Sequence, residues 1–167
     1  MIRLRLQAFF IFGVFLAFNW RFYAILHPSI FWENILRKAV KRMYRQYNPN
    51  PAGARVGDCV VRAISRATGQ TWEQTLCGLC VEALQQCDMP SANHVWGAYL
   101  RRKGFTRHAL ENECPDCYTV ADFCRDHPDG TYVLATGTHA VCASGGDWHD
   151  TWDSGTEVPA YYWQKEE

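Results

Sequence analysis

The 167-residue sequence predicts an α+β domain, in which a helical half precedes a half built of strands. Between residues 58 and 103, apolar residues recur at helical spacing and the runs are bounded by capping residues and glycines. From Thr131 onwards, short runs rich in aromatic and β-branched residues alternate with glycine-rich turns, which is typical of an antiparallel sheet. A chain of this length suits one such domain.

An apolar and basic extension, residues 1–42, precedes the predicted domain at 43–167. Residues 6–20 are strongly apolar and signal-anchor-like, but the run is shorter than the roughly 20 residues that cross a bilayer. Residues 31–47 alternate apolar and basic positions, which predicts an amphipathic helix on a membrane surface. We expect residues 6–47 to contact a membrane if the extension belongs to the functional protein. The alternative is a functional chain that begins at Met43.

Charge is distributed unevenly along the chain. The first 47 residues hold eight Lys or Arg residues against a single acid, Glu33, whereas the remainder holds nine basic and 16 acidic residues. An acidic body excludes the basic face that nucleic-acid binding needs, so we expect no nucleic-acid partner. The eight cysteines lack the spacing of a small disulfide-rich domain, which suggests reduced thiols. We therefore expect the 43–167 domain to be cytoplasmic, or membrane-anchored if residues 1–42 are genuine.

Two helices are predicted in the first part of the domain. Asp58 stands at the N-cap of the first, and Gly69 ends it after an apolar stripe at helical spacing. Thr71 and Gln74 form the sequence signature of a capping box for the second helix, over residues 72–87.

The remaining elements follow in order. Ser91 is predicted to cap a third helix that runs to Lys103, and residues 105–110 suggest a short strand. Thr119 is predicted to cap a short helix over residues 120–126. Four β-type runs then complete the sheet half, at residues 131–136, 139–144, 148–152 and 160–163.

The stretch GDCVVRAIS places Cys59 directly after the N-cap of the first helix. The partial positive charge of a helix N-terminus lowers the pKa of a thiol, and the free first-turn N–H of Cys59 can bind an oxyanion. Cys59 is therefore the best-placed candidate for a nucleophile. The alternative is a small buried residue at a helix start.

His139 lies at the start of a predicted strand, where a base is held rigidly and stays accessible. With a three-residue loop at 145–147, the hairpin register pairs His139 with Asp153, which could orient the imidazole. A two-residue loop would instead pair His139 with Trp152 and make Asp150 the nearer acid. We favour Asp153, because it ends its strand level with the histidine.

The order Cys59, His139, Asp153 resembles that of papain-like cysteine peptidases, whose nucleophile opens a helix and whose other residues come from the later sheet. GDCVVRAIS is similar to the nucleophile motif of ovarian-tumour-type deubiquitinases, and the spacing from His139 to Asp153 is similar to that in peptidase domains of bacteriocin-exporting transporters. More closely, residues 43–167, with MYRQYNPNP, VWGAYLRRKGF, CPDCYTV, TGTH, TWDSG and YYW, resemble small papain-like proteins of bacteria and their phages.

The resemblance implies a thiol hydrolase that cleaves a peptide or isopeptide bond of a protein or peptide substrate without a cofactor. Papain-like enzymes usually carry a glutamine before the nucleophile as a second oxyanion donor, and position 53 here is glycine. The candidates that remain are the Cys59 backbone and the upstream amides of Asn50 and Asn48. Without a second donor, the alternative is a catalytically degenerate binding or assembly domain of the same fold.

Two CxxC pairs offer a second kind of site. Four thiolates could hold a structural zinc tetrahedrally, and these are Cys77, Cys80, Cys114 and Cys117. The interval between the pairs is longer than in compact zinc ribbons, and the first pair falls within a predicted helix. We therefore expect no metal in the catalytic site and retain zinc only for the binding-domain alternative.

Overall fold

The computed structural model describes residues 43–111 and 117–166. The chain divides into one unit over Met1–Lys41 and another over Arg42–Glu167, and all the described residues belong to the second. Most of the segment expected to contact a membrane, residues 6–47, therefore lies outside the described residues. In the described ranges, no helix is long and apolar enough to cross a bilayer.

Four helices are described, and their starts and ends largely follow the predicted signals. They are α3 (Cys59–Thr68), α4 (Trp72–Gln86), α5 (Asn93–Arg102) and α6 (Val120–Asp126). The capping box of Thr71 and Gln74 is present at α4, and Gly69 ends α3 with φ of 71°. The predicted cap at Ser91 is wrong, because Ala92 occupies the N-cap of α5 and makes no side-chain cap.

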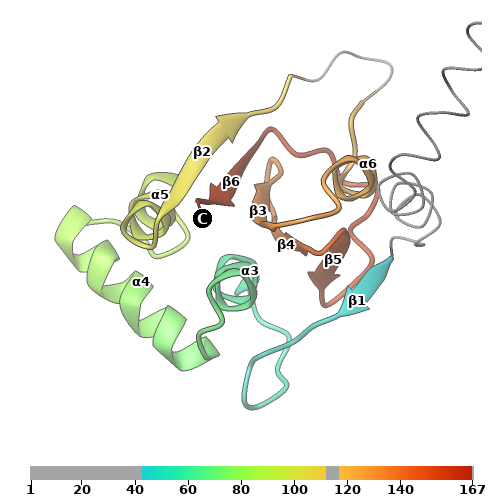
Figure 1. Cartoon of the computed structure of the whole chain (residues 1–167). Coiled ribbons are helices and arrows are strands. Elements are labelled where there is room, and N and C mark those ends of the chain that lie inside the picture. The colour runs from blue at the N-terminus through green and yellow to red at the C-terminus, as the bar shows by residue number, and fades with distance from the viewer. Residues whose placement is uncertain (1–42, 112–116, 167) are drawn as a thin grey trace, which may run out of the picture. The chain divides into compact units, whose positions relative to one another are not determined.

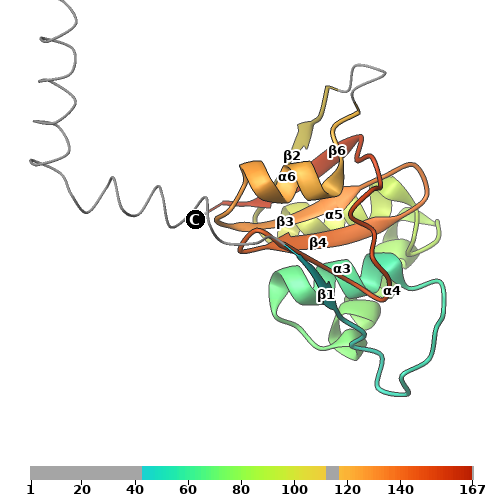
Figure 2. The same ribbon diagram turned by 90° about the vertical axis from the view of Figure 1, so that its right-hand side faces the viewer.

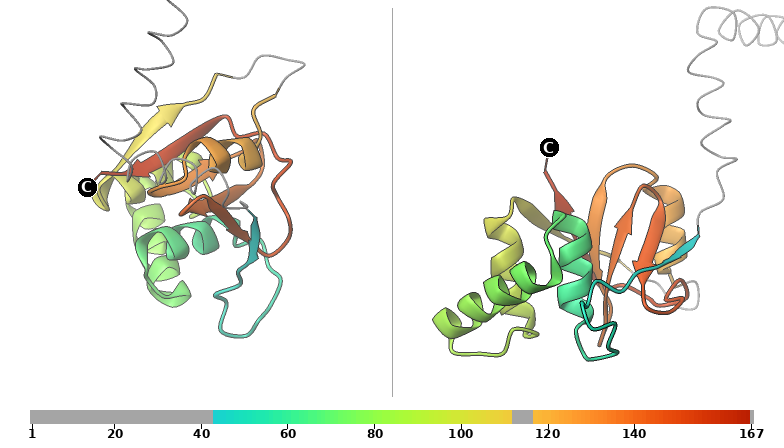
Figure 3. Two further views of the ribbon diagram at one scale, coloured as in Figure 1. Left: turned by 45° about the vertical axis from the view of Figure 1, so that its right-hand side comes forward. Right: turned by 90° about the horizontal axis from the view of Figure 1, so that it is seen from below.

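Within the described ranges, six strands form one mixed sheet in the order β1-β5-β4-β3-β6-β2. They are β1 (Tyr44–Gln46), β2 (Phe105–Ala109), β3 (Thr131–Ala135), β4 (Ala140–Ser144), β5 (Asp147–Asp150) and β6 (Tyr161–Lys165). The α+β prediction is confirmed, but the sheet is not wholly antiparallel. β1, which precedes all four helices, pairs parallel with β5 at one edge of the sheet (Figures 1 and 3). Residues 44–46 are thus a strand and not the end of an amphipathic helix.

The β4–β5 hairpin has a two-residue turn. Ser144 pairs with Asp147, which leaves only Gly145 and Gly146 in the loop. Both glycines have positive φ, 62° and 79°, as a tight hairpin turn that follows the sheet twist requires. The favoured three-residue loop is therefore wrong, and the register is the one that sets His139 level with Trp152.

Helices cover both faces of the sheet, as Figure 2 shows, with α6 on one face and α3, α4 and α5 on the other. Alternate strand residues point into two separate cores. Val133 and Cys142 pack with Ile64 of α3, whereas their neighbour Leu134 packs with Phe123 of α6. Because α3 packs directly on β4, the start of α3 is held against the start of that strand. This contact positions the candidate nucleophile.

Candidate active site

Cys59 is the first residue of α3 and is half-buried at the wall of an open pocket of about 510 Å³. Asp58 occupies the N-cap position, yet its side chain caps no N–H group of the helix. Among the described residues, nothing accepts a hydrogen bond from the backbone N–H of Cys59. The nucleophile candidate therefore sits beside a donor that is available to a developing oxyanion.

His139 lies in the same pocket, immediately before β4. The local turn fixes its backbone: the N–H donates to Oγ1 of Thr136 at 3.1 Å, and the carbonyl accepts from the Thr136 N–H at 2.9 Å. Its Nε2 atom is 2.5 Å from Oδ2 of Asp150. The imidazole also lies 5.4 Å from the ring of Trp152, centroid to centroid. A carboxylate and an aromatic ring thus position the imidazole, which still lines the pocket.

Asp150, and not Asp153, is the acid beside the histidine. Oδ1 of Asp153 accepts from Nε1 of Trp148 at 2.9 Å and from the Gly155 N–H at 3.1 Å, so this carboxylate shapes the turn after β5. The two-residue hairpin turn explains the correction, because a loop shorter by one residue shifts every cross-strand partner by one. The structure brings together Cys59, His139 and Asp150.

A buried network joins the triad to the start of α3. Nη1 of Arg62 bonds Oδ1 of Asp58, and Nη2 of Arg62 is 3.3 Å from Oδ1 of Asp150. Nε1 of Trp72 donates to Oδ2 of Asp58 at 2.8 Å. The three charged residues are only 6%, 7% and 2% exposed for Asp58, Arg62 and Asp150. Arg62 therefore bridges the two buried carboxylates and fixes that of Asp150 against His139.

The electrostatics of the site favour a thiolate–imidazolium pair. Burial alone would raise the pKa of Cys59, but hydrogen bonds from His139 and the Ala140 N–H, with the charges of His139 and Arg62, lower it below its ordinary value. Burial would lower the pKa of His139, but its bonds to Asp150 and Cys59 raise it to about 9. Both shifts favour the state in which the proton resides on the imidazole and the negative charge on the sulfur.

The upstream amides do not complete an oxyanion hole. Nδ2 of Asn48 donates to the carbonyls of Gly53 and Ala54 at 3.3 and 3.4 Å, and Oδ1 of Asn50 accepts from the Ala52 N–H at 2.9 Å. Within the described ranges neither asparagine lines the pocket that holds Cys59 and His139, so the structure does not bring these two amides to the site. Their side chains instead organise the loop that leads to α3.

Arg55 is the cation at the mouth of the pocket. It lines the pocket four residues before Cys59 and is exposed to solvent. The other arginine of the lining, Arg62, is occupied by two carboxylates. Sequence inspection missed both. The spacing of Asp58 and Arg62, four residues apart on a helix, was a signal for the buried pair, whereas no sequence signal distinguished Arg55.

The cysteine pairs do not form a metal site in the part of the chain that the structure describes. Cys77 and Cys80 are exposed on α4, and Cys114 lies outside the described residues. In the described ranges, no group of three or more His, Cys, Asp or Glu side chains could hold a metal ion.

Comparisons with known proteins find no family model, no curated protein and no solved structure that matches this chain. The geometry of the site therefore carries the functional proposal.

Proposed function

We propose that the domain is a papain-like thiol hydrolase that cleaves a peptide or isopeptide bond through Cys59, His139 and Asp150. The observation that carries the proposal is the imidazole of His139, which lies 2.5 Å from the carboxylate of Asp150 and lines one pocket with the thiol of Cys59, whose pKa it lowers. A nucleophile, a base and a group that orients the base are the three parts that covalent acyl transfer needs.

The reaction follows from the protonation state of the pair. The Cys59 thiolate attacks the carbonyl carbon, and the carbonyl oxygen gains a negative charge near the Cys59 N–H. His139, as the imidazolium, gives its proton to the leaving nitrogen, so that the C–N bond breaks and a thioester remains on Cys59. Neutral His139 then takes a proton from water, whose oxygen attacks the thioester and releases the acid and the Cys59 thiolate, while His139 regains its charge.

Arg55 supplies the second oxyanion interaction in this proposal, in place of the absent upstream glutamine and of Asn48 and Asn50. Arg55 lines the same pocket as Cys59, and its guanidinium is a permanent cation that can reach a developing negative charge there. A charged donor there would supply the second interaction in an oxyanion hole whose other donor is the backbone N–H of Cys59. The degenerate binding-domain alternative fits the site less well. A domain that only binds a partner does not require a histidine whose pKa is raised to about 9 by Asp150 and by the neighbouring thiol.

We further propose a protein or peptide substrate and a cytoplasmic setting for the domain. The pocket is open, and its lining is mixed: Trp152 and Val56 are exposed apolar groups beside Arg55 and Thr138. Such a surface suits an extended polypeptide that brings both apolar side chains and backbone polar groups.

The test uses an aldehyde-bearing peptide, which traps a reactive thiolate as a reversible hemithioacetal, together with iodoacetamide followed by peptide mass analysis. We expect Cys59 to be alkylated first near neutral pH and to be protected by the aldehyde, although Cys77, Cys80 and Cys87 are more exposed. His139→Ala should slow alkylation of Cys59, because the group that lowers the thiol pKa is lost. Faster reaction of the exposed cysteines, with Cys59 unprotected, would refute the proposal.

A further inference from the structure

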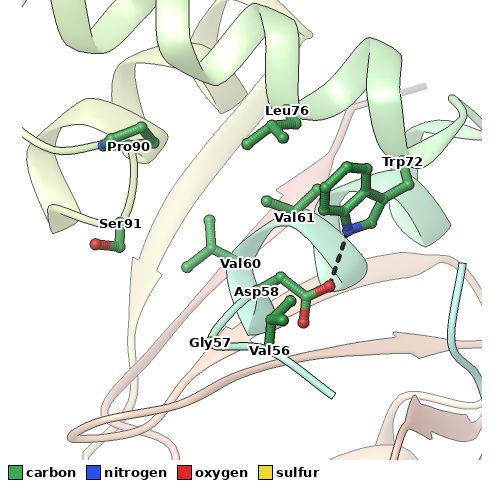
Figure 4. Close-up of a pocket in the computed structure, with 9 residues that line it drawn as sticks. All are labelled: Val56, Gly57, Asp58, Val60, Val61, Trp72, Leu76, Pro90 and Ser91. Atoms are coloured by element: carbon green, nitrogen blue, oxygen red, sulfur yellow. Dashed lines mark hydrogen bonds between the residues drawn. The ribbon is translucent and has the colours of Figure 1, made fainter. Parts of the chain in front are cut away.

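A second cavity lies beside the catalytic pocket, between the N-terminus of α3, the first turns of α4 and the chain at Pro90 and Ser91 (Figure 4). Its volume is about 300 Å³. Side chains of Val60, Val61 and Leu76 point into it from the two helices, as the close-up shows. Most of its lining is apolar, so an apolar group that enters it leaves water for a hydrocarbon surface.

The two cavities share a wall. Val56 and Gly57 line both of them, and Asp58 lines the apolar cavity while the next residue, Cys59, lines the catalytic pocket. Val56, which lines both cavities, is 52% exposed, so solvent reaches the boundary between them. A substrate bound at Cys59 can therefore extend a neighbouring side chain into the apolar cavity without leaving the surface.

The one carboxylate in the apolar cavity does not attract a cation. Asp58 is bonded through Oδ1 to Arg62 and through Oδ2 to Nε1 of Trp72, the bond drawn in Figure 4. Its charge is thus neutralised by a buried guanidinium, and both oxygens are occupied. The cavity therefore favours a neutral, apolar group over a Lys or Arg side chain.

The position of His139 decides which part of the substrate reaches the cavity. His139 must protonate the leaving nitrogen, and it enters the site from the sheet, so the leaving group lies on the sheet side of Cys59. The acyl portion extends the other way. Among the described residues, the apolar cavity is lined by the helical half and the loop before it, with no residue of β3, β4 or β5.

We propose that the cavity is a specificity pocket that binds an apolar side chain, of the size of leucine or phenylalanine, in the acyl portion of the substrate. The inference rests on the proposed function, because it assigns the part of the substrate from the role of His139. It predicts selection at one position on the acyl side of the scissile bond.

The experiment measures the rate at which peptidyl acyloxymethyl ketones label Cys59, by intact-protein mass. The thiolate displaces the carboxylate and forms a thioether, and the peptide part occupies the acyl side. Probes carry Gly, Leu, Phe, Lys or Glu at each of the three residues nearest the ketone. At one position we expect Leu or Phe to label faster than Gly by at least about 10-fold, because a single methylene in a hydrophobic pocket already changes rates by about 10–200-fold, and we expect Lys and Glu to give no gain.

Two variants test whether this cavity is the source of the preference. Leu76→Gln places an amide on the wall and should reduce the advantage of Leu over Gly, whereas Ser91→Phe should fill the cavity and favour Gly. Leu84→Gln is the matched control, since Leu84 lies on the same helix, is 80% exposed and lines neither cavity. Thermal unfolding and iodoacetamide labelling of each variant separate a change in preference from a change in folding or thiol reactivity.

The outcomes separate the two proposals. Labelling of Cys59 at the same rate by every probe, or a preference that both cavity variants leave unchanged, overturns the specificity pocket and leaves the hydrolase intact. Absence of labelling at Cys59 by every probe overturns the hydrolase. Binding is followed independently in Cys59→Ala, by the NMR signal of the Trp72 indole N–H, during titration with N-acetyl-leucinamide. A shift of that signal supports an apolar site, and no shift at millimolar ligand contradicts it.

Discussion

The imidazole of His139 and the carboxylate of Asp150 meet at 2.5 Å between Nε2 and Oδ2, although the two residues are eleven positions apart in the chain and a hairpin turn lies between them. Asp150 is in turn held by Nη2 of Arg62 and by the Thr151 N–H at 2.7 Å. Its pKa is lowered: burial opposes the shift, but the hydrogen bond and charge of His139 outweigh it. The acid is therefore ionised across the range in which the histidine titrates.

Replacing Asp150 should change the titration of His139. In Asp150→Asn the amide oxygen can still accept from Nε2, but the negative charge is lost, so the pKa of His139 should fall from about 9. The alkaline limb of the kcat/KM profile for a peptide amide should move to lower pH, with a decrease in rate of roughly 10²–10⁴-fold near neutrality. Asp153→Asn is the matched control, and an equal effect in both variants would contradict the assignment.

The wild-type protein should show a bell-shaped dependence of kcat/KM on pH. Activity rises as Cys59 deprotonates, at a pH below the ordinary thiol range, and falls as His139 loses its proton at about 9. Alkylation of Cys59 by iodoacetamide needs thiolate but no proton donor, so its rate should rise without a decline above pH 9. Rates measured from about pH 5 to about pH 10 test both curves. A single rise at the pKa of an ordinary thiol, in both curves, would contradict an ion pair.

Loss of Arg62 should destabilise the fold strongly. Arg62→Ala leaves the buried carboxylates of Asp58 and Asp150 without their shared cation, which should lower the free energy of unfolding by about 3–5 kcal/mol. Arg66 is the matched control: it lies one turn further along α3, is exposed, and is 5.9 Å above the ring of Tyr47. Arg66→Ala should cost about 0.5–1 kcal/mol. Urea unfolding measures both, and similar losses would mean that the buried network contributes little.

Arg55 should affect catalysis more than stability. Arg55→Ala removes the exposed cation at the pocket and should lower kcat by about 10²–10³-fold, the usual effect of losing one oxyanion donor. Arg55→Lys should recover part of this loss, because lysine keeps the positive charge but lacks the planar guanidinium group with its several N–H donors. Arg107→Ala, an exposed arginine that lies over Tyr161 of β6, is the control. An unchanged kcat in Arg55→Ala would place the second donor elsewhere.

The sequence was sufficient for the parts of the site that local signals define. Cys59 follows an N-cap position and His139 follows a turn before a strand, so both could be identified without tertiary information. The acid depended on a hairpin turn whose two possible lengths differ by one residue. With Gly145 and Gly146 both able to take positive φ, only the folded hairpin decides between them.

Other features were not predictable because they depend on distant contacts. The three-residue β1 has no pattern of its own and follows a helix-like run, and its parallel partner lies a hundred residues further on. Arg62 falls on an apolar helix face, where a charged residue is stable only because carboxylates from two elements surround it. The asparagines of the preceding loop had suitable amides, but the loop uses them for its own turns.

The pairing of β1 with β5 joins the beginning of the described domain to a strand near its end, so this edge of the sheet can form only late in synthesis. The Tyr47 N–H donates to the carbonyl of Asp150 at 2.7 Å, directly after β1. β1 is therefore synthesised early but has no partner strand until β5 has been synthesised. A growing chain that has left the ribosome up to α5 already displays Cys59, but has neither His139 nor Asp150. The Cys59 thiol of such a chain lacks the imidazole that lowers its pKa, so in the proposed hydrolase the reactive thiolate forms only after β4 and β5 have joined the sheet.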